Sequence, residues 1–173
     1  KQLLELSPGS EGAIPADIQP RRSAHPFTGL LVAGLLYGYY RIVDAHHLSG
    51  YDMKLKMVPI RKGRSQVYVG FPETALDLFD HNVIYLCGAD LTALTLRQKN
   101  MLAEYVRRGG GLIVFGGKPG LVVGECGRGR VAVVGMTCFG APAEGQTPFW
   151  QWRSWVLLLR DLAWWVAGQD EHF

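Results

Sequence analysis

The stretch RRGGGLIVFGGKPG, residues 107–120, decides the fold class of this chain. Arg107 and Arg108 predict the end of a helix, because cations are favoured at the negative end of the helix dipole. Gly109 supplies the left-handed cap that commonly follows such an end. The apolar run 112–115 then predicts a short buried strand, and the glycine-rich turn 116–120 ends it. Wholly apolar strands of this kind are typical of a parallel sheet that is covered on both faces.

Two further apolar runs upstream have the same character. GLLVAG (29–34) and NVIYLCG (82–88) predict buried central strands, whereas the alternating MKLKMVPI (53–60) predicts a half-exposed strand. Helices are predicted over 36–48, 72–80 and 95–108. The last of these begins with Thr95 and Gln98, which form a capping box.

The C-terminal third predicts a hairpin followed by a long helix. LVV (121–123) and RVAVVG (130–135) flank a glycine-containing turn, as paired antiparallel strands do. Pro148 at the first helical position predicts a helix that carries Trp152 and Trp155 on its apolar stripe and ends at Gly168. Strands that alternate with helices along the chain predict an α/β fold with a mainly parallel sheet and helices on both faces.

The composition is that of one globular domain. The chain has 173 residues, of which 48% are hydrophobic and 19% charged, so it can bury a real core. The net charge of +3 is small and scattered, and we therefore expect no nucleic acid partner. No run approaches about 18 consecutive apolar residues, so we expect no membrane insertion.

Three cysteines bear on the cellular compartment. Cys87, Cys126 and Cys138 lack metal-ligand spacing, and an odd number argues against a disulfide framework. We therefore expect a reducing, cytoplasmic location. No signal-peptide pattern is present, and the first residue is lysine, which is typical of a processed product or an excised piece of a longer polypeptide.

Two longer stretches resemble a known superfamily. HNVIYLCGADLTALTLRQKNMLAEYVRRGGGLIVFGG (81–117) is similar to the middle of class I glutamine-amidotransferase-like proteins, in particular the putative amidotransferase and trehalose-utilisation-type domains. GRGRVAVVGMTCFG (127–140) and the tryptophan-bearing segment 147–168 resemble their ending. The resemblance covers roughly residues 28–168. It implies a flavodoxin-like three-layer sandwich with a C-terminal hairpin, between a proline-rich arm or linker (1–27) and a terminal tail (169–173).

The catalytic motifs of that superfamily are not matched. Its active members carry Gly-x-Cys-x-Gly on a strand-to-helix elbow and a later His-x-Glu pair. Aligning the elbow with 116–120 puts Lys118 in the place of the cysteine, and a lysine does not act as a thiolate does. His172 follows Glu171, so the pair is absent. A parallel crossover needs about a dozen residues; either the elbow helix has been lost or residues are missing near 117–121.

Candidate site residues gather at the carboxyl ends of the predicted strands, where ligands bind in such sheets. The predicted ligand-binding residues are Gly34, Tyr37, Cys87, Asp90, Gly116, Gly117 and Lys118. Cys87 with His46 would make a nucleophile and base; the alternative is a packed apolar thiol. Cys138 is placed similarly. His46 and His47 are adjacent on a helix and do not converge on one ion, and the acids Asp44, Glu73, Asp90 and Glu144 show no paired spacing. We expect no metal and no cofactor.

The sequence thus favours a non-catalytic amidotransferase-like domain that binds a small molecule or a protein partner. The first alternative is a hydrolase or sugar-modifying enzyme of the same superfamily that uses Cys87. The second is a structural module that mediates homo-oligomerisation, in which the proline-rich arm wraps a neighbouring copy.

Overall fold

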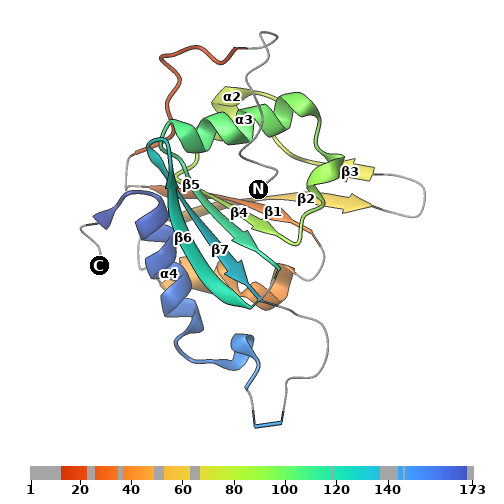
Figure 1. The fold of residues 1–173 in the computed structure, drawn as a ribbon, viewed down its shortest axis with the longest axis vertical. Coiled ribbons are helices and arrows are strands. Elements are labelled where there is room, and N and C mark those ends of the chain that lie inside the picture. Colours follow the sequence, from red (N-terminus) through yellow and green to blue (C-terminus); the bar gives the residue numbers. More distant parts are fainter. Residues whose placement is uncertain are drawn as a thin grey trace.

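The computed structural model describes residues 13–22, 26–34, 37–48, 53–62, 67–117, 119–136, 144–145 and 147–170. Its centre is a seven-stranded sheet in the order β3-β2-β1-β4-β5-β7-β6 (Figure 1). The strands are β1 (Phe27–Ala33), β2 (Met53–Lys62), β3 (Val67–Val69), β4 (Val83–Cys87), β5 (Gly111–Phe115), β6 (Gly120–Cys126) and β7 (Gly129–Gly135). The five inner strands are mutually parallel, and only the edge strands β3 and β6 run antiparallel to their neighbours. The predicted α/β class with a mostly parallel sheet is confirmed.

Helices lie on both faces of the sheet. The helices α1 (Ile42–Leu48) and α4 (Trp155–Val166) pack on one face, and α2 (Ala75–Phe79) and α3 (Leu96–Arg107) on the other (Figure 1). Three short 3-10 turns complete the described elements: η1 (Tyr37–Tyr40), η2 (Leu91–Ala93) and η3 (Phe149–Gln151). Side chains of a strand alternate between faces, so Leu31 of β1 packs in the α1 and α4 cluster while Leu30 packs in the α2 and α3 cluster.

The ends of α3 follow from its sequence. The Oγ1 atom of Thr95 accepts a hydrogen bond from the Gln98 N–H (3.2 Å), and the Gln98 side-chain oxygen accepts one from the Thr95 N–H (3.0 Å). This is the predicted capping box. At the other end Gly109 has φ +112° and its N–H donates to the Val106 carbonyl (2.8 Å), as predicted for a left-handed cap.

The start of the last helix differs from the prediction. The helix does not begin at Pro148: η3 comes first, Trp152 is extended (φ −70°, ψ 123°) and 48% exposed, and α4 starts at Trp155. The indole of Trp155 is fully buried and donates to the Tyr40 carbonyl at 2.9 Å. This tertiary contact fixes where the helix begins and overrides the local signal of Pro148.

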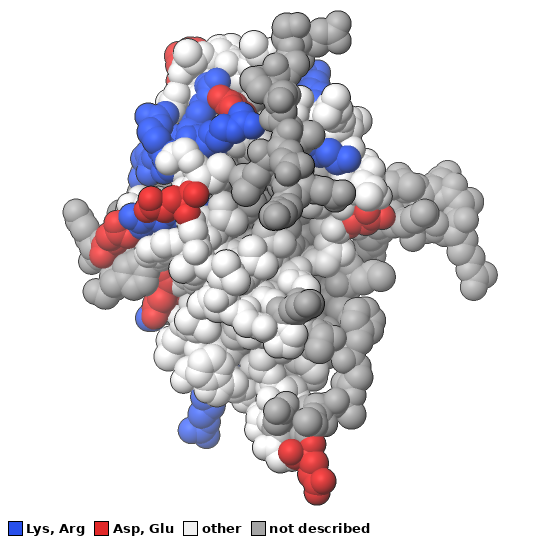
Figure 2. Space-filling model, in the orientation of Figure 1, with Lys and Arg blue, Asp and Glu red and all other residues white. Residues whose placement is uncertain are grey.

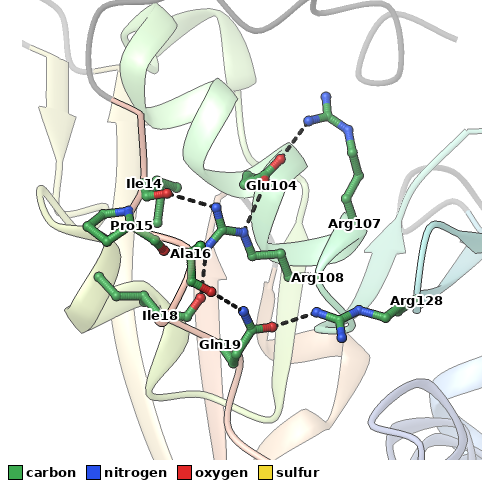
Figure 3. Close-up of polar contacts among 9 residues, drawn as sticks. All are labelled: Ile14, Pro15, Ala16, Ile18, Gln19, Glu104, Arg107, Arg108 and Arg128. Atoms are coloured by element: carbon green, nitrogen blue, oxygen red, sulfur yellow. Dashed lines mark hydrogen bonds and ion pairs between the residues drawn. The ribbon is translucent and has the colours of Figure 1, made fainter.

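Part of the proline-rich N-terminal stretch packs on the domain. The guanidinium of Arg108 donates to the carbonyl oxygens of Ile14 (2.8 Å), Pro15 (2.6 Å) and Ile18 (2.8 Å), and its Nε donates to Glu104 (2.8 Å) (Figure 3). The side chains of Ile14 and Ile18 pack against the α2 and α3 cluster. Arg108, at the end of α3, therefore supplies hydrogen-bond donors for the carbonyl groups of the segment 14–18.

The amino ends of the central strands are joined by Asn82. Its side-chain oxygen accepts from the Thr28 N–H (2.8 Å), and its side-chain nitrogen donates to the Arg21 carbonyl (3.2 Å). Its own backbone N–H donates to the Thr28 carbonyl (2.8 Å), and its carbonyl accepts from Gly111 (3.3 Å). One buried asparagine, through its side chain and its backbone, thus links β1, the start of β4 and β5 to the N-terminal segment.

Candidate functional site

The strand ends that carry the predicted site lie side by side. Ala33, Cys87 and Phe115 are register partners in β1, β4 and β5. The N–H of Gly34 donates to the Cys87 carbonyl (2.9 Å), and a Cβ placed on Gly34 would lie 2.0 Å from the Gly88 oxygen. Backbone atoms of Gly88 therefore lie directly against Gly34.

The Cys87 thiol lies in the protein core. Its relative exposure is 0%, and it belongs to the same cluster as Tyr40 and Phe115. A thiol must reach its substrate to act as a nucleophile, and this one is fully buried within the hydrophobic cluster. The side chain of His46, the predicted base, lies outside the described residues.

The remaining predicted residues divide into three groups. Asp90 is exposed and caps η2, because its Oδ1 accepts from the N–H (3.0 Å) and the hydroxyl (2.6 Å) of Thr92. Gly116 (φ +129°) and Gly117 (φ +96°) border open space, since a Cβ on either would meet no atom of a non-neighbouring residue within 4 Å. The third group lies outside the described residues: the side chains of Tyr37 and His47, and all of Lys118 and Cys138.

The connection after β5 is short. Residues 116–119 alone join β5 to β6, which runs antiparallel along the far side of β7. A crossover from β5 to a further parallel strand would need about a dozen residues. The chain instead passes over the end of β7 and returns to it through the turn after Cys126.

An apolar groove lies on the sheet face beside α3. Its volume is about 370 Å³. Val114, Val133 and Val122 are register partners in three neighbouring strands and form one row of its floor. The complete lining comprises Ala103, Val106, Arg107, Leu112, Val114, Val122, Val123, Gly124, Glu125, Cys126, Val131 and Val133. Helix α3 forms one wall through Ala103, Val106 and Arg107.

Basic side chains gather near the end of α3, and one of them, Arg107, lines the groove. Figure 2 shows Lys and Arg gathered near the end of α3, above a largely uncharged surface. Arg107 donates to Glu104 at 2.7 Å, and Arg128 to Gln19 at 2.6 Å. The hydrogen bond from Arg108, and secondarily that from Arg107, lowers the pKa of Glu104 below its ordinary value. These arginines therefore hold the N-terminal segment and the end of α3 in place.

The described residues show neither a metal site nor a membrane-spanning helix. No three His, Cys, Asp or Glu side chains in the described part of the chain are grouped so that they could hold a metal ion. Within that part, every helix is too short or too polar to cross a bilayer.

Comparison with known proteins gives one informative likeness. No protein-family model matches the sequence, and no curated protein matches it either. The structure is similar to that of Cytoplasmic Protein STM3548 from Salmonella typhimurium, with a TM-score of 0.50 and 13% sequence identity. The match covers 84% of this chain and 98% of that one. At this identity the likeness concerns the fold alone.

Proposed function

We propose that this chain is a non-catalytic, glutamine-amidotransferase-like domain that binds a small molecule or a protein partner. The observation that carries the proposal is the four-residue connection between β5 and β6. It has no length for an elbow helix. The sequence at this turn offers Lys118 where a nucleophilic cysteine would stand, and Cys87 is fully buried.

A flavodoxin-like topology is part of the proposal. The parallel strands, renumbered in chain order, are arranged 2-1-3-4-5, which is the flavodoxin-like order. The antiparallel β6 and β7 then form the C-terminal hairpin that the sequence favours. We also propose a cytoplasmic location; its support is the cysteine content and the name of the similar Salmonella protein.

The binding surface we favour is the apolar groove beside α3. Apolar clefts with a few polar groups at the rim are the usual form of ligand sites. Its floor is made of valines on three adjacent strands, and Arg107 and Glu125 stand at its border. A second location, the turn at Gly116 and Gly117, supplies backbone beside open space.

A glutaminase assay tests the absence of catalysis. We expect the protein to release no ammonia from glutamine above the rate of the buffer, and Cys87→Ala to behave identically. Ammonia release that disappears in Cys87→Ala would overturn the proposal and establish the enzyme alternative.

A dye-binding experiment tests the groove. The fluorescence of anilinonaphthalene sulfonate, an apolar anionic dye, should rise on binding to the native protein. Val133→Gln, on the groove floor, should weaken this binding, whereas Leu96→Gln should not, because Leu96 is exposed on α3 but does not line the groove. Equal binding by both variants would show that the dye, and by implication a ligand, does not use the groove.

A further inference from the structure

Strand β6 forms a long edge of the sheet. Among the described strands it pairs with β7 alone, along all seven of its residues. The opposite edge, β3, has three residues. Short edge strands are one protection against unwanted strand pairing. Strand β6, with seven residues, lacks this protection.

Strand β6 is also apolar on both of its faces. Val122 lies on the α3 face, where its register partner Val133 lines the groove, and it is 67% exposed. Leu121 and Val123 lie on the opposite face and are 49% and 50% exposed. Its single charged residue is Glu125, and it contains no lysine. Charged side chains are the other common protection of an edge.

The backbone of β6 has a defined outward side. The carbonyl of Val134 accepts from the Gly116 N–H (3.1 Å), so Val134 directs its backbone groups towards β5. Backbone groups alternate in direction along a strand, so Val133 bonds its register partner Val122 in β6. The N–H and C=O groups of Leu121 and Val123 therefore point away from the sheet.

We propose that β6 pairs with β6 of a second copy of this chain, antiparallel and about a two-fold axis at Val122. A helix laid in the groove would cover one face only, whereas an added strand flanks Leu121, Val122 and Val123 together and bonds their outward backbone groups. The strand that fits is β6 itself. In this register Leu121 lies opposite Val123 of the second copy, and the two exchange backbone hydrogen bonds. Val122 lies opposite Val122.

Other registers fit less well. The side-chain period allows shifts of two residues only. Centring the axis on Val123 would set Leu121 opposite Glu125, an apolar residue against a charge. Centring it on Leu121 would shorten the pairing, because Val123 would then lie opposite Pro119, which has no N–H to donate. The resulting dimer is isologous, as most homodimers are. The pairing does not use the proline-rich arm, and it shares Val122 with the floor of the groove.

The oligomeric state tests the pairing. Sedimentation velocity over a concentration series should show a monomer–dimer equilibrium for the native chain. Val122→Lys sets like charges opposite each other and should raise the dissociation constant by about tenfold or more. Leu76→Lys is the control, because Leu76 is 68% exposed on α2 and should leave the dimer unchanged. A monomer at every concentration, or a dimer that Val122→Lys does not weaken, would overturn the proposal.

Disulfide trapping tests the register. In a Cys126→Ser background, which removes the native thiol of β6, Val122→Cys should cross-link to its own copy on mild oxidation, because opposed Cβ atoms lie about 4.5–5.5 Å apart. Leu121→Cys should cross-link slowly, because its counterpart lies diagonally about 7–8 Å away. Circular dichroism of each variant verifies the fold. Faster trapping at position 121 than at 122 would refute the register.

Discussion

Replacing Asn82 with alanine should destabilise the domain by about 3 kcal/mol. Asn82 is 1% exposed, and its side-chain oxygen accepts the N–H of Thr28, itself in a buried strand. Alanine leaves that donor without a partner and without water, which costs about 1–3 kcal/mol. The lost bond to the Arg21 carbonyl adds roughly 0.5–1.5 kcal/mol, because the oxygen there can regain a partner.

A loss of this size is measurable and has a matched control. Domains of this kind are stable by about 5–15 kcal/mol, so urea unfolding followed by tryptophan fluorescence should show a clearly lower midpoint with an unchanged slope. Thr28→Val keeps the backbone N–H and its bond to Asn82. It removes the hydroxyl, which donates to the Asp80 carbonyl at 2.8 Å and more weakly to the Asn82 side-chain oxygen at 3.1 Å. It should cost about 1 kcal/mol. The reasoning is refuted if Asn82→Ala loses less than Thr28→Val does.

Three further perturbations have definite expected outcomes. Gly34→Ala should lower the melting temperature strongly, because its Cβ would overlap the loop after β4. Gly38→Ala should change the melting temperature little, because its Cβ would meet nothing within 4 Å. Equal melting temperatures for the two variants would contradict the close packing at Gly34. Burial lowers the pKa of His81 below 6.5, so the folded state binds fewer protons than the unfolded one. This contribution to stability is complete above about pH 6.5 and is lost as the pH falls from there towards the lowered pKa. Urea unfolding of His81→Gln at several pH values should lack this part of the pH dependence. A pH profile like that of the native protein would exclude His81 as its source. In the native protein a thiol reagent should modify the partly exposed Cys126 well before the buried Cys87. Mass spectrometry of protease digests measures the modification of each cysteine. Rapid modification of Cys87 would show that the end of β4 opens to solvent.

The sequence predicts most of the sheet because its signals there are local. Apolar runs bounded by glycines predict β1, β4 and β5, and Thr95 with Gln98 fixes the start of α3 through contacts three residues apart. The start of α4 escapes prediction for the opposite reason. It depends on the bond from Trp155 to Tyr40, 115 residues away in the chain.

The candidate site was less predictable than the fold. Sequence reasoning places Cys87 at a strand end, where the structure also has it, but its burial depends on a cluster built from distant parts of the chain, Tyr40 and Phe115 among them. Sequence reasoning does not predict the groove beside α3. Two sequence features could indicate it: the short connection after β5, and the apolar run LVV, whose residues face both sides of one strand.

The connection of four residues after β5 leads directly into the exposed edge strand β6 and has no length for a helix. Threonine or lysine would suit the exposed positions of an edge strand and would protect it from pairing. The chain has valine there instead, 67% exposed at Val122. Apolar side chains gain stability only when something excludes water from them, so this exposed face supports the proposal that a second copy pairs with β6.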